Sequence, residues 1–360
     1  MKLSRRSMVA GMISVPAAGM MGGRAFGQEV INLTMSSSHP TILPWITPLQ
    51  TVVVAKSNDM LAARGSKYRI NWTESYGGAL YGYTETLEAI TQQLTDMGWI
   101  GALFEPTALP LQNIMYSAPF VTQTVQQAIN IVNTLNDTEQ AMKDEWARHD
   151  IKFFGSCVSD GYDLATKKPI EKLSDLEGLK LVGPVTASAW VEPLGATMIG
   201  TGMPAIYGQL QTGVGDGTLL VGTSVYALKL HEQAPFITKV NTGPLTFGAF
   251  GMNRNVYDSL PEDVQEVLTE LGRGYSDENA RIIEAQLATL DARFRKAGAT
   301  VSEMPMEQKQ EWANRLPDLG KAWVDALAAR GIPAADIMNR YIETARAEGA
   351  KPLRDWSANV

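Results

Sequence analysis

The sequence predicts an α/β protein built from two interleaved lobes. From Val30 to about Gly251, short strand-like patterns alternate with helical ones, which is typical of helices packed on sheets. The 360 residues are enough for two domains. Because no Pro-, Gly- or Ser-rich linker divides the chain into halves, we expect it to cross between the lobes more than once.

Hydrophobic spacing places the individual elements. Apolar alternation and short apolar runs predict strands at residues 30–35, 68–73, 152–158 and 179–182, and helical spacing predicts helices at 49–63 and 84–94. After Pro261 the pattern becomes almost entirely helical. We expect one very long helix up to about Gly298, and then a C-terminal tail of helices at 306–329 and 333–348.

The composition limits the partners that the protein can have. The formal net charge is −7, from 31 basic and 38 acidic residues with no basic run, which argues against nucleic acid and against an anionic membrane surface. Cys157 is the single cysteine, so no internal disulfide can form and the fold must rely on its core. The longest apolar runs, at 109–121 and 243–252, are too short or too interrupted to be inserted in a membrane.

The N-terminus predicts export. A basic head containing Arg5 and Arg6 precedes an apolar stretch, and the paired arginines are typical of the twin-arginine pathway. The general export pathway is the alternative route. Small residues at the end of the stretch favour cleavage between Gly27 and Gln28. We therefore expect residues 1–27 to be a signal peptide and the mature protein to lie in the periplasm.

Few side chains are available for catalysis. The chain has three histidines and one cysteine, and it lacks the Gly-x-Ser-x-Gly, Gly-x4-Gly-Lys-Ser/Thr and His-Glu-x-x-His motifs. Cys157 lies in an apolar strand pattern, where a buried and inert thiol is expected. The glycine-rich segment 213–217 follows a helical pattern and is expected to be a tight turn, not a dinucleotide-binding loop. We expect neither an enzyme nor a cofactor or metal site.

An ordered series of segments carries a family resemblance. The segments are Lys-Pro-Ile at 168–170, Leu-Ser-Asp-Leu-Glu-Gly-Leu-Lys-Leu at 173–181, Leu-Gly-Ala at 194–196 and Tyr-Gly-Gln-Leu-Gln-Thr-Gly-Val-Gly-Asp-Gly at 207–217. In this order they resemble the solute-binding proteins of tripartite ATP-independent periplasmic (TRAP) transporters, of the dicarboxylate-binding DctP type. The segment around Glu85 and the Leu260-Pro261 pair before the long helix also fit.

The resemblance implies both a fold and a function. The fold is two α/β lobes of the periplasmic binding protein type II kind, joined by crossing strands and a helix that spans both. Lobe I would contain residues 28–160 and 246–286, and lobe II residues 161–245 and 287–360 with the C-terminal helices. A small organic solute would bind between the lobes and be passed to integral membrane subunits, with ion gradients driving transport.

Local physics supports one of the resembling segments. The Ser174 hydroxyl can cap a short turn, with Glu177 reaching back to complete a capping box. Gly178 is expected to end the turn, and the strand at 179–182 follows it.

The sequence departs from the family where the ligand is held. The family carries an arginine in a Lys-Ile-Arg-Val-Pro-like segment, and this arginine grips the ligand carboxylate with two parallel hydrogen bonds. Here the segment 180–184 has Val182 at that position, and a valine cannot bind a carboxylate. An asparagine of the family that touches ligand is also missing, because Thr218 and Leu220 belong to the run that replaces it.

The remaining candidates for the binding site are acidic, aromatic or apolar. The predicted ligand-binding residues are Glu85, Tyr76, Trp99, Asp163, Val182, Trp190, Tyr207, Thr218 and Leu220. Tyr83, Glu105 and Tyr226 are further candidates, and core packing is the alternative interpretation for each aromatic residue. A pocket that has lost positive charge favours a neutral or cationic ligand, such as an amine, an amino alcohol or a polar aromatic compound. If the ligand is an acid, Arg69 or Lys167 would have to replace the missing arginine.

Three other functions compete with a transport receptor of the TRAP type. The same fold could present a ligand to a membrane-bound signalling partner. It could carry an enzyme, although the supply of histidine and cysteine is small. It could also serve an ATP-driven importer, but the long helix and the segment 207–217 favour the TRAP type.

Overall fold

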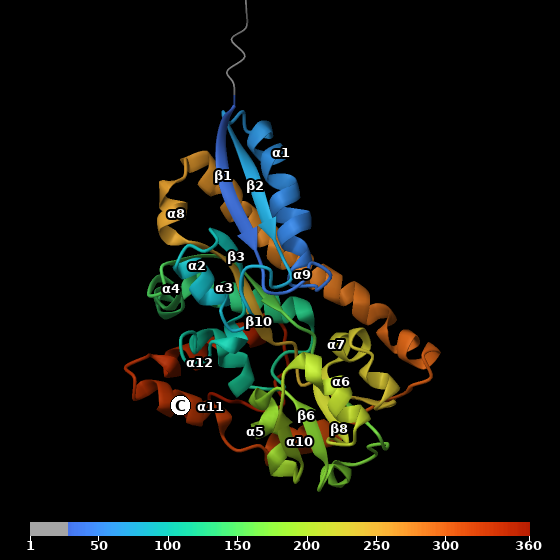
Figure 1. The fold of residues 1–360 in the computed structure, drawn as a ribbon. Coiled ribbons are helices and arrows are strands. Elements are labelled where there is room, and N and C mark those ends of the chain that lie inside the picture. Colours follow the sequence, from blue (N-terminus) through green and yellow to red (C-terminus); the bar gives the residue numbers. More distant parts are fainter. Residues whose placement is uncertain (1–27) are drawn as a thin grey trace, which may run out of the picture.

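Two β-sheets, each covered by helices, form two lobes joined side by side (Figure 1). The computed structural model describes residues 28–360, so the signal peptide predicted for residues 1–27 lies outside the described part. The two lobes confirm the predicted α/β class. Within the described residues, no helix is long and apolar enough to cross a membrane.

The first sheet has five strands in the order β2-β1-β3-β10-β4. The strands are β1 (Glu29–Ser36), β2 (Tyr68–Ser75), β3 (Met97–Ile100), β4 (Ile151–Val158) and β10 (Thr246–Asn253). β1 runs parallel to β2 and β3, whereas β10 runs antiparallel to β3 and β4. The predicted strands at 30–35, 68–73 and 152–158 are therefore confirmed, and all parallel strands end at the same edge.

The second sheet has six strands in the order β11-β9-β5-β8-β6-β7. The strands are β5 (Tyr162–Thr166), β6 (Lys180–Gly183), β7 (Thr197–Gly200), β8 (Gly217–Val221), β9 (Phe236–Lys239) and β11 (Thr300–Glu303). β6 runs parallel to β7 and β8, and β5 runs antiparallel to β8 and β9. Because β5 enters this sheet directly from the first lobe, the ends of β6 and β8 face that lobe.

Helices and short helical turns cover both sheets. Before the crossing these are η1 (Leu49–Val54), α1 (Ala55–Ala63), α2 (Thr86–Thr91), η2 (Ala102–Phe104), η3 (Leu111–Ser117), α3 (Val125–Thr138) and α4 (Gln140–Ala147). In the second lobe they are η4 (Leu173–Leu176), η5 (Val185–Ala187), α5 (Ser188–Val191), η6 (Glu192–Leu194), α6 (Met203–Gln211), α7 (Gly222–Ala227) and η7 (Leu230–Glu232). The C-terminal part contains α8 (Arg254–Ser259), α9 (Glu262–Lys296), α10 (Met306–Arg315), α11 (Leu319–Ala328) and α12 (Ala334–Ala347).

The long helix α9 connects the lobes, as the sequence predicts. It begins directly after Pro261 and runs for 35 residues, about 52 Å at 1.5 Å per residue. It ends before Gly298, which adopts the positive φ of 89° that favours glycine after a helix. Figure 1 shows it running diagonally from the first lobe to the second. Its contacts include β4 of the first sheet and both α7 and β11 of the second lobe.

Two large hydrophobic cores lie beneath the sheets. One joins β1, η1 and the first part of α9 in the first lobe. The larger core joins the second sheet to α3 and to the C-terminal helices, so residues from the predicted range of lobe I contribute to it. The exact limits predicted for the lobes remain a prediction, although the first-sheet strands lie within 29–158 and 246–253 and the second-sheet strands within 162–239 and 300–303.

One local prediction is wrong in its details. Asp175, and not Glu177, reaches back at the turn before β6, because its carboxylate accepts hydrogen bonds from the backbone N–H groups of Glu171 and Lys172, at 2.9 and 3.0 Å. Gly178 ends the turn with a φ of 76°, as expected. The glycine-rich segment follows α6 as a turn that leads into β8, which confirms that part of the prediction.

Candidate functional site

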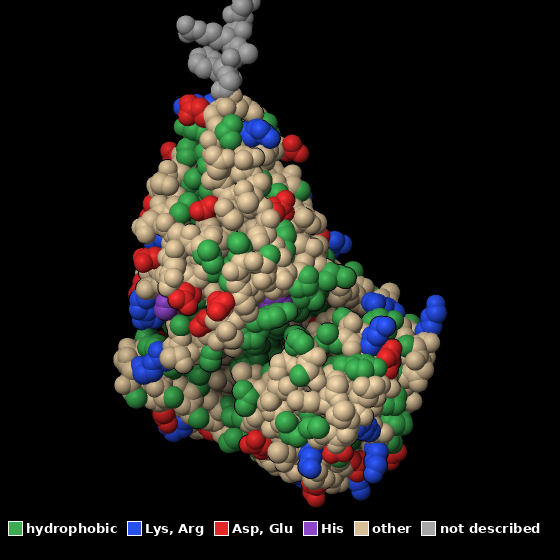
Figure 2. All heavy atoms as spheres, in the orientation of Figure 1, with side chains coloured by type: hydrophobic (Ala, Val, Ile, Leu, Met, Phe, Trp, Pro, Cys, Tyr) green, Lys and Arg blue, Asp and Glu red, His purple; other side chains and the backbone are tan. Residues whose placement is uncertain are grey.

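A hollow lies between the two lobes, and its walls are mostly hydrophobic (Figure 2). The carboxyl ends of the parallel strands β1 and β3 face it from the first sheet, and those of β6 and β8 face it from the second. In open α/β sheets, ligands bind outside the carboxyl ends of parallel strands. The hollow is therefore the candidate binding site.

Two crossing segments form the hinge beside this hollow. The first connects β4 to β5 through residues 159–161, and the second connects β9 to β10 through residues 240–245. They are bonded to each other, because Ser159 N–H donates to the Leu245 carbonyl at 2.9 Å and Tyr162 N–H donates to Thr242 Oγ1 at 3.2 Å. Paired backbone of this kind lets the lobes rotate about a narrow region while each sheet stays intact.

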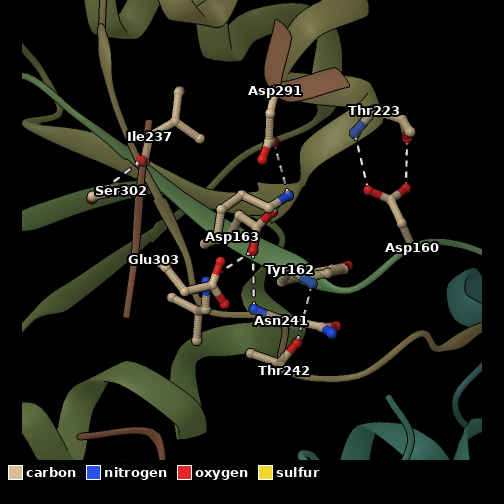
Figure 3. Close-up of polar contacts among 12 residues, drawn as sticks. Asp160, Tyr162, Asp163, Thr223, Ile237, Asn241, Thr242, Asp291, Ser302 and Glu303 are labelled. Atoms are coloured by element: carbon tan, nitrogen blue, oxygen red, sulfur yellow. Dashed lines mark hydrogen bonds and ion pairs between the residues drawn. The ribbon is translucent and has the colours of Figure 1, made fainter. Parts of the chain in front are cut away.

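A buried ion pair fixes the lobe II side of the hinge (Figure 3). Asp163 Oδ2 accepts from Lys239 Nζ at 2.5 Å, and Asp163 Oδ1 accepts from the N–H groups of Val240 and Asn241, each at 2.9 Å. Asp291 of α9 lies 3.9 Å from the same ammonium. Burial disfavours the charged ammonium, but the neighbouring Asp163 carboxylate outweighs it and raises the pKa of Lys239. Asp163, a predicted ligand-binding residue, thus has a full set of protein partners.

A second buried carboxylate, Asp160, forms no direct ion pair with any residue in the range 28–360. Its two oxygens accept from Thr223 N–H at 3.0 Å and from Thr223 Oγ1 at 2.6 Å (Figure 3). Burial raises the pKa of Asp160, although the two Thr223 donors oppose the shift. These bonds tie the first crossing segment to the start of α7.

An aromatic wall lines the end of the first sheet, with His39 at its centre. The imidazole centroid lies 4.3 Å from the ring of Tyr83 and 4.6 Å from that of Trp99, both edge-on. Phe104 and Trp45 follow at 6.2 and 6.1 Å. β1 ends at Ser36, and two further serines lead directly to His39, so the imidazole lies just beyond the end of that strand. We call these five residues the aromatic wall.

The aromatic wall and the end of β1 beside it contain few polar contacts. His39 Nδ1 lies 3.0 Å from Ser38 Oγ, and in the neighbouring Ser36 the hydroxyl oxygen lies 2.9 Å from the hydroxyl of Tyr81, which is not part of the wall. Burial lowers the pKa of His39 to about 3, so the imidazole is neutral near pH 7. Trp45 Nε1 is buried and has no hydrogen-bond partner among the described residues.

The predicted lobe I residues lie along this same edge. Trp99 belongs to the aromatic wall, and its Nε1–H donates to Cys157 Sγ at 3.2 Å. Tyr76 follows β2 and is half-buried, with its hydroxyl donating to Glu74 Oε2 at 2.9 Å. Glu85 precedes α2 and is exposed; its carboxylate accepts from Gly82 N–H at 2.7 Å.

The predicted lobe II residues are more dispersed. Val182 is fully buried at the end of β6, and its side chain packs close to Gly215. Leu220 is buried in β8 opposite Asp163. Thr218, earlier in the same strand, has a buried hydroxyl that bonds to no other side chain or backbone group within residues 28–360.

Two predicted aromatic residues are tied to other parts of lobe II. Trp190 is buried in the larger core, where its Nε1–H donates to the Tyr116 carbonyl at 3.1 Å. Tyr207 is half-buried on α6 and donates from its hydroxyl to Glu232 Oε2 at 2.9 Å. The structure does not bring these two rings to the aromatic wall, and contact of any predicted residue with ligand stays a prediction.

Neither basic residue that could replace the missing arginine lies at the hollow. Arg69 is the second residue of β2, about 20 Å before the strand end at 3.3 Å per residue. Lys167 follows the far end of β5 and donates to the Gly215 carbonyl at 2.8 Å. In the view of Figure 2, lysine and arginine side chains lie outside the hollow.

His39 and Trp45 are the residues that sequence reasoning missed. No motif or spacing in the sequence assigns a role to His39, one of three histidines. The sequence did contain a signal for His39, namely the polar run directly after a buried strand. In α/β sheets, ligand-binding side chains commonly lie at the carboxyl ends of strands. Trp45 had no comparable signal, because the fold of the loop 40–48 is what packs its indole against His39 and Phe247.

Two α/β lobes with a paired hinge, a spanning helix and a hollow between strand ends define a two-lobed solute-binding protein. The sequence agrees with this class: residues 59–324 match the family described as bacterial extracellular solute-binding protein, family 7, or DctP. The chain belongs to this family, and the resemblance to TRAP solute-binding receptors is thereby confirmed. Proteins of this family act outside the cytoplasm and serve transport.

Curated relatives are similar over parts of the chain. A solute-binding protein of Albidiferax ferrireducens is 26% identical over 151 residues, which are 40% of this chain and 44% of the relative. The C4-dicarboxylate-binding periplasmic protein DctP of Vibrio cholerae is 25% identical over 234 residues, or 63% of this chain and 68% of the relative. The chain spans about half the length of the first curated relatives that it matches.

Solved structures share the fold at low identity. A TRAP periplasmic solute-binding protein of Desulfovibrio salexigens, in an open complex, aligns with a TM-score of 0.76 and 23% identity over 88% of this chain and 96% of that one. A TRAP solute-binding protein of Rhodoferax ferrireducens with copurified benzoate aligns with a TM-score of 0.74 and 20% identity, over 89% and 98%. One from a Sulfitobacter species, with bound β-D-galacturonate, has a TM-score of 0.70 and 18% identity, over 87% and 100%.

Proposed function

We propose that this protein is the periplasmic receptor of a TRAP-type transporter, and that it passes a small organic solute to integral membrane subunits. Membership of the family, the hinge and the hollow support this role. Export with removal of residues 1–27 is part of the proposal.

The solute is proposed to be neutral or cationic and not a dicarboxylate. The observation that carries this choice is the replacement of the family's arginine by Val182, which is buried and apolar. Arg69 and Lys167 do not reach the hollow, and the Lys239 ammonium is already paired with Asp163. A carboxylate that is taken out of water without a cation loses roughly several kcal/mol of hydration free energy, and none of these three basic residues is free to offset the loss.

Closure of the lobes supplies part of the driving force for capture. Apolar side chains next to the strand ends are exposed: Ile42 is 81% exposed, Tyr83 46% and Val185, on the opposite lobe, 67%. Covering a Val- or Ile-sized side chain contributes about 1.5–3 kcal/mol when burial is complete. A ligand that brings the lobes together gains this contribution and thereby shifts the population towards the closed state.

The first test is a ligand search on the exported protein. Mass spectrometry of the denatured protein identifies the copurified solute, and a thermal-shift screen compares amines, neutral polar aromatics, and mono- and dicarboxylates. We expect neutral compounds or amines to raise the melting temperature. If only carboxylates raise it, the proposed ligand class is wrong.

A matched pair of variants locates the site. Tyr83→Ala removes a ring that contacts His39 and should reduce the thermal shift produced by the ligand. Tyr68→Ala removes a ring at the opposite end of β2 and should leave the shift unchanged. Equal effects of the two variants would place the ligand elsewhere.

Transport is tested separately with the membrane subunits in proteoliposomes. Uptake of the identified solute should require both this protein and an ion gradient. If uptake does not depend on the protein, and the solute instead alters the activity of a membrane kinase, the chain is a sensory module.

A further inference from the structure

The segment 351–356, which follows α12, connects parts of the two lobes in addition to the two crossing segments and α9. It is hydrogen-bonded on one side to α10 and on the other side to the segment 119–123, which lies between η3 and α3. We call residues 351–356 the C-terminal strap and residues 119–123 the brace. What the strap joins follows from the contacts of these two neighbours.

α10 is fixed to the second lobe. The Trp312 indole N–H donates to the Trp190 carbonyl of α5 at 2.7 Å. The Lys309 ammonium donates to a carboxylate oxygen of Glu303 in β11 at 2.9 Å. Because α5 and β11 belong to the second lobe, α10 moves with that lobe.

The C-terminal strap is bonded to α10 at two places. Gln310 Nε2 donates to the Leu353 carbonyl at 2.6 Å. Arg354 Nη1 donates to the carbonyls of Ala313 and Leu316 at the end of the helix, at 3.2 and 2.5 Å. The strap is thereby attached to the second lobe.

The opposite side of the strap is bonded to the brace. The exposed side chain of Gln123 pairs with one peptide of the strap in both directions, because its Oε1 accepts from Lys351 N–H at 2.8 Å and its Nε2 donates to the Lys351 carbonyl at 3.2 Å. The Trp356 indole N–H donates to the Pro119 carbonyl at 2.8 Å. The brace is therefore held at both of its ends.

The brace in turn holds the second crossing segment of the hinge. Thr122 Oγ1 donates to the Pro244 carbonyl at 3.1 Å, and Asn241 Nδ2 donates to the Gln123 carbonyl at 3.3 Å. The brace leads directly into α3, which contacts β4 and β10 of the first sheet. The second lobe is thus connected through the strap to the brace, and through the brace to the hinge and the first sheet.

Two residues at this junction have a left-handed backbone. Phe120 of the brace has a φ of 63° and Asn241 of the crossing segment has a φ of 51°, which is uncommon for residues other than glycine. Phe120 N–H donates to the Thr242 carbonyl at 2.6 Å, and the Phe120 carbonyl accepts from Leu353 N–H at 3.0 Å. Such conformations persist only where the surrounding structure holds them, and here the strap is part of that structure.

We infer that the C-terminal strap restrains the hinge, and that Gln123 is the positioning residue through which it does so. When lobes rotate, a few hinge residues absorb the change in φ and ψ. The second crossing segment can absorb it only if its bonds to the brace yield, and the strap opposes this. The inference goes beyond the proposed receptor function, because it concerns the equilibrium between open and closed lobes in the absence of any ligand.

The test measures the distance between the lobes by pulsed electron paramagnetic resonance. Spin labels are attached to the exported protein at Leu94→Cys in the first lobe and Val214→Cys in the second, where both native side chains are exposed. Cys157 is buried and stays unlabelled. The protein is freed of copurified solute by unfolding and refolding, and with an intact strap it should give one narrow distance distribution.

Variants release the strap from either side. Gln123→Ala removes both side-chain bonds to Lys351, and the loss of two hydrogen bonds should raise the population of shorter distances about tenfold, since closing covers apolar side chains at the rim of the hollow. Arg354→Ala frees the strap from α10 and should act in the same direction. Gln140→Ala is the matched control, because Gln140 is exposed and donates to Asp144 within α4, at 2.7 Å; it should keep the original distribution.

The melting temperature of each variant separates restraint of the hinge from simple stabilisation. If Gln123→Ala melts at a lower temperature but keeps the original distance distribution, the strap contributes only to stability and the inference is wrong. An equal change in Gln140→Ala would also overturn it. Because these measurements need no ligand, the receptor role can fail in proteoliposomes while the inference about the hinge holds.

Discussion

Replacing Asp163 by asparagine tests the ion pair that anchors the hinge. In Asp163→Asn, Oδ1 can still accept from the N–H groups of Val240 and Asn241, as in the wild type. The new NH2 group takes the place of Oδ2 and faces the Lys239 ammonium, which it cannot bind. The substitution therefore removes the ion pair and little else.

The size of the effect follows from burial. Breaking a buried pair by changing one partner costs about 3–5 kcal/mol, and the lower end applies if Asp291, 3.9 Å away, partly compensates Lys239. Unfolding entropy of about 2.1 cal/mol/K per residue gives about 0.7 kcal/mol/K for residues 28–360. The melting temperature of Asp163→Asn should therefore fall by about 4–7 °C.

The assay is differential scanning calorimetry with an exposed pair as control. Asp325 accepts from Lys321 at 2.8 Å on the surface of α11, where such pairs contribute about 0–1 kcal/mol. Asp325→Asn should therefore change the melting temperature by no more than about 1 °C. If Asp163→Asn melts within the range of this control, the buried pair does not stabilise the hinge and the reasoning fails.

Three further predictions concern the core. Burial raises the pKa of Glu145 to about 7, so the folded carboxyl keeps a proton that the unfolded chain releases above about pH 4.5. The free energy of unfolding should therefore fall by about 3 kcal/mol as the pH rises from 4.5 to 7. Urea unfolding at several pH values measures this slope, and Glu145→Gln should lack it. A Cβ on Gly155 would collide with the carbonyl oxygen of Gly272 in α9, so Gly155→Ala should lower the free energy of unfolding by about 1–3 kcal/mol. Gly208 lies in open space within α6, and Gly208→Ala should raise the same free energy by about 0.5–1 kcal/mol. Equal melting temperatures of the two variants would contradict this packing. Burial raises the pKa of the Cys157 thiol to about 12, so iodoacetamide should modify it only at the rate of unfolding, and fast alkylation of the native protein would refute the assignment.

Short-range patterns in the sequence were sufficient for most of the elements. The strand at 30–35 and the helix after Pro261 follow from apolar spacing, because each side chain's burial is set by its position on one strand or one helix face. The turn before β6 was harder. Ser174, Asp175 and Glu177 can each cap it, and the choice of Asp175 depends on backbone geometry that the sequence does not specify.

The site was harder to predict than the fold. Val182 was identified by its place in a motif, and the structure shows that it is buried. The partners of Asp163 could not be predicted, because Lys239 lies 76 residues away in the chain. The unsatisfied N–H of Trp45 was equally inaccessible, since a missing bond is recognised only when all neighbours are in place.

The sequence by itself determined the α/β class, the family and the absence of the usual arginine, because these depend on residue types at fixed spacings along the chain. Only the tertiary structure decided which groups meet in the hollow. Rings from β3 and from the segments that follow β1, β2 and β3 converge on His39, although they are separated by up to 65 residues in the chain, from His39 to Phe104. Such contacts arise from the packing of two sheets against one long helix, and the sequence encodes that packing only through the sum of many weak apolar contacts.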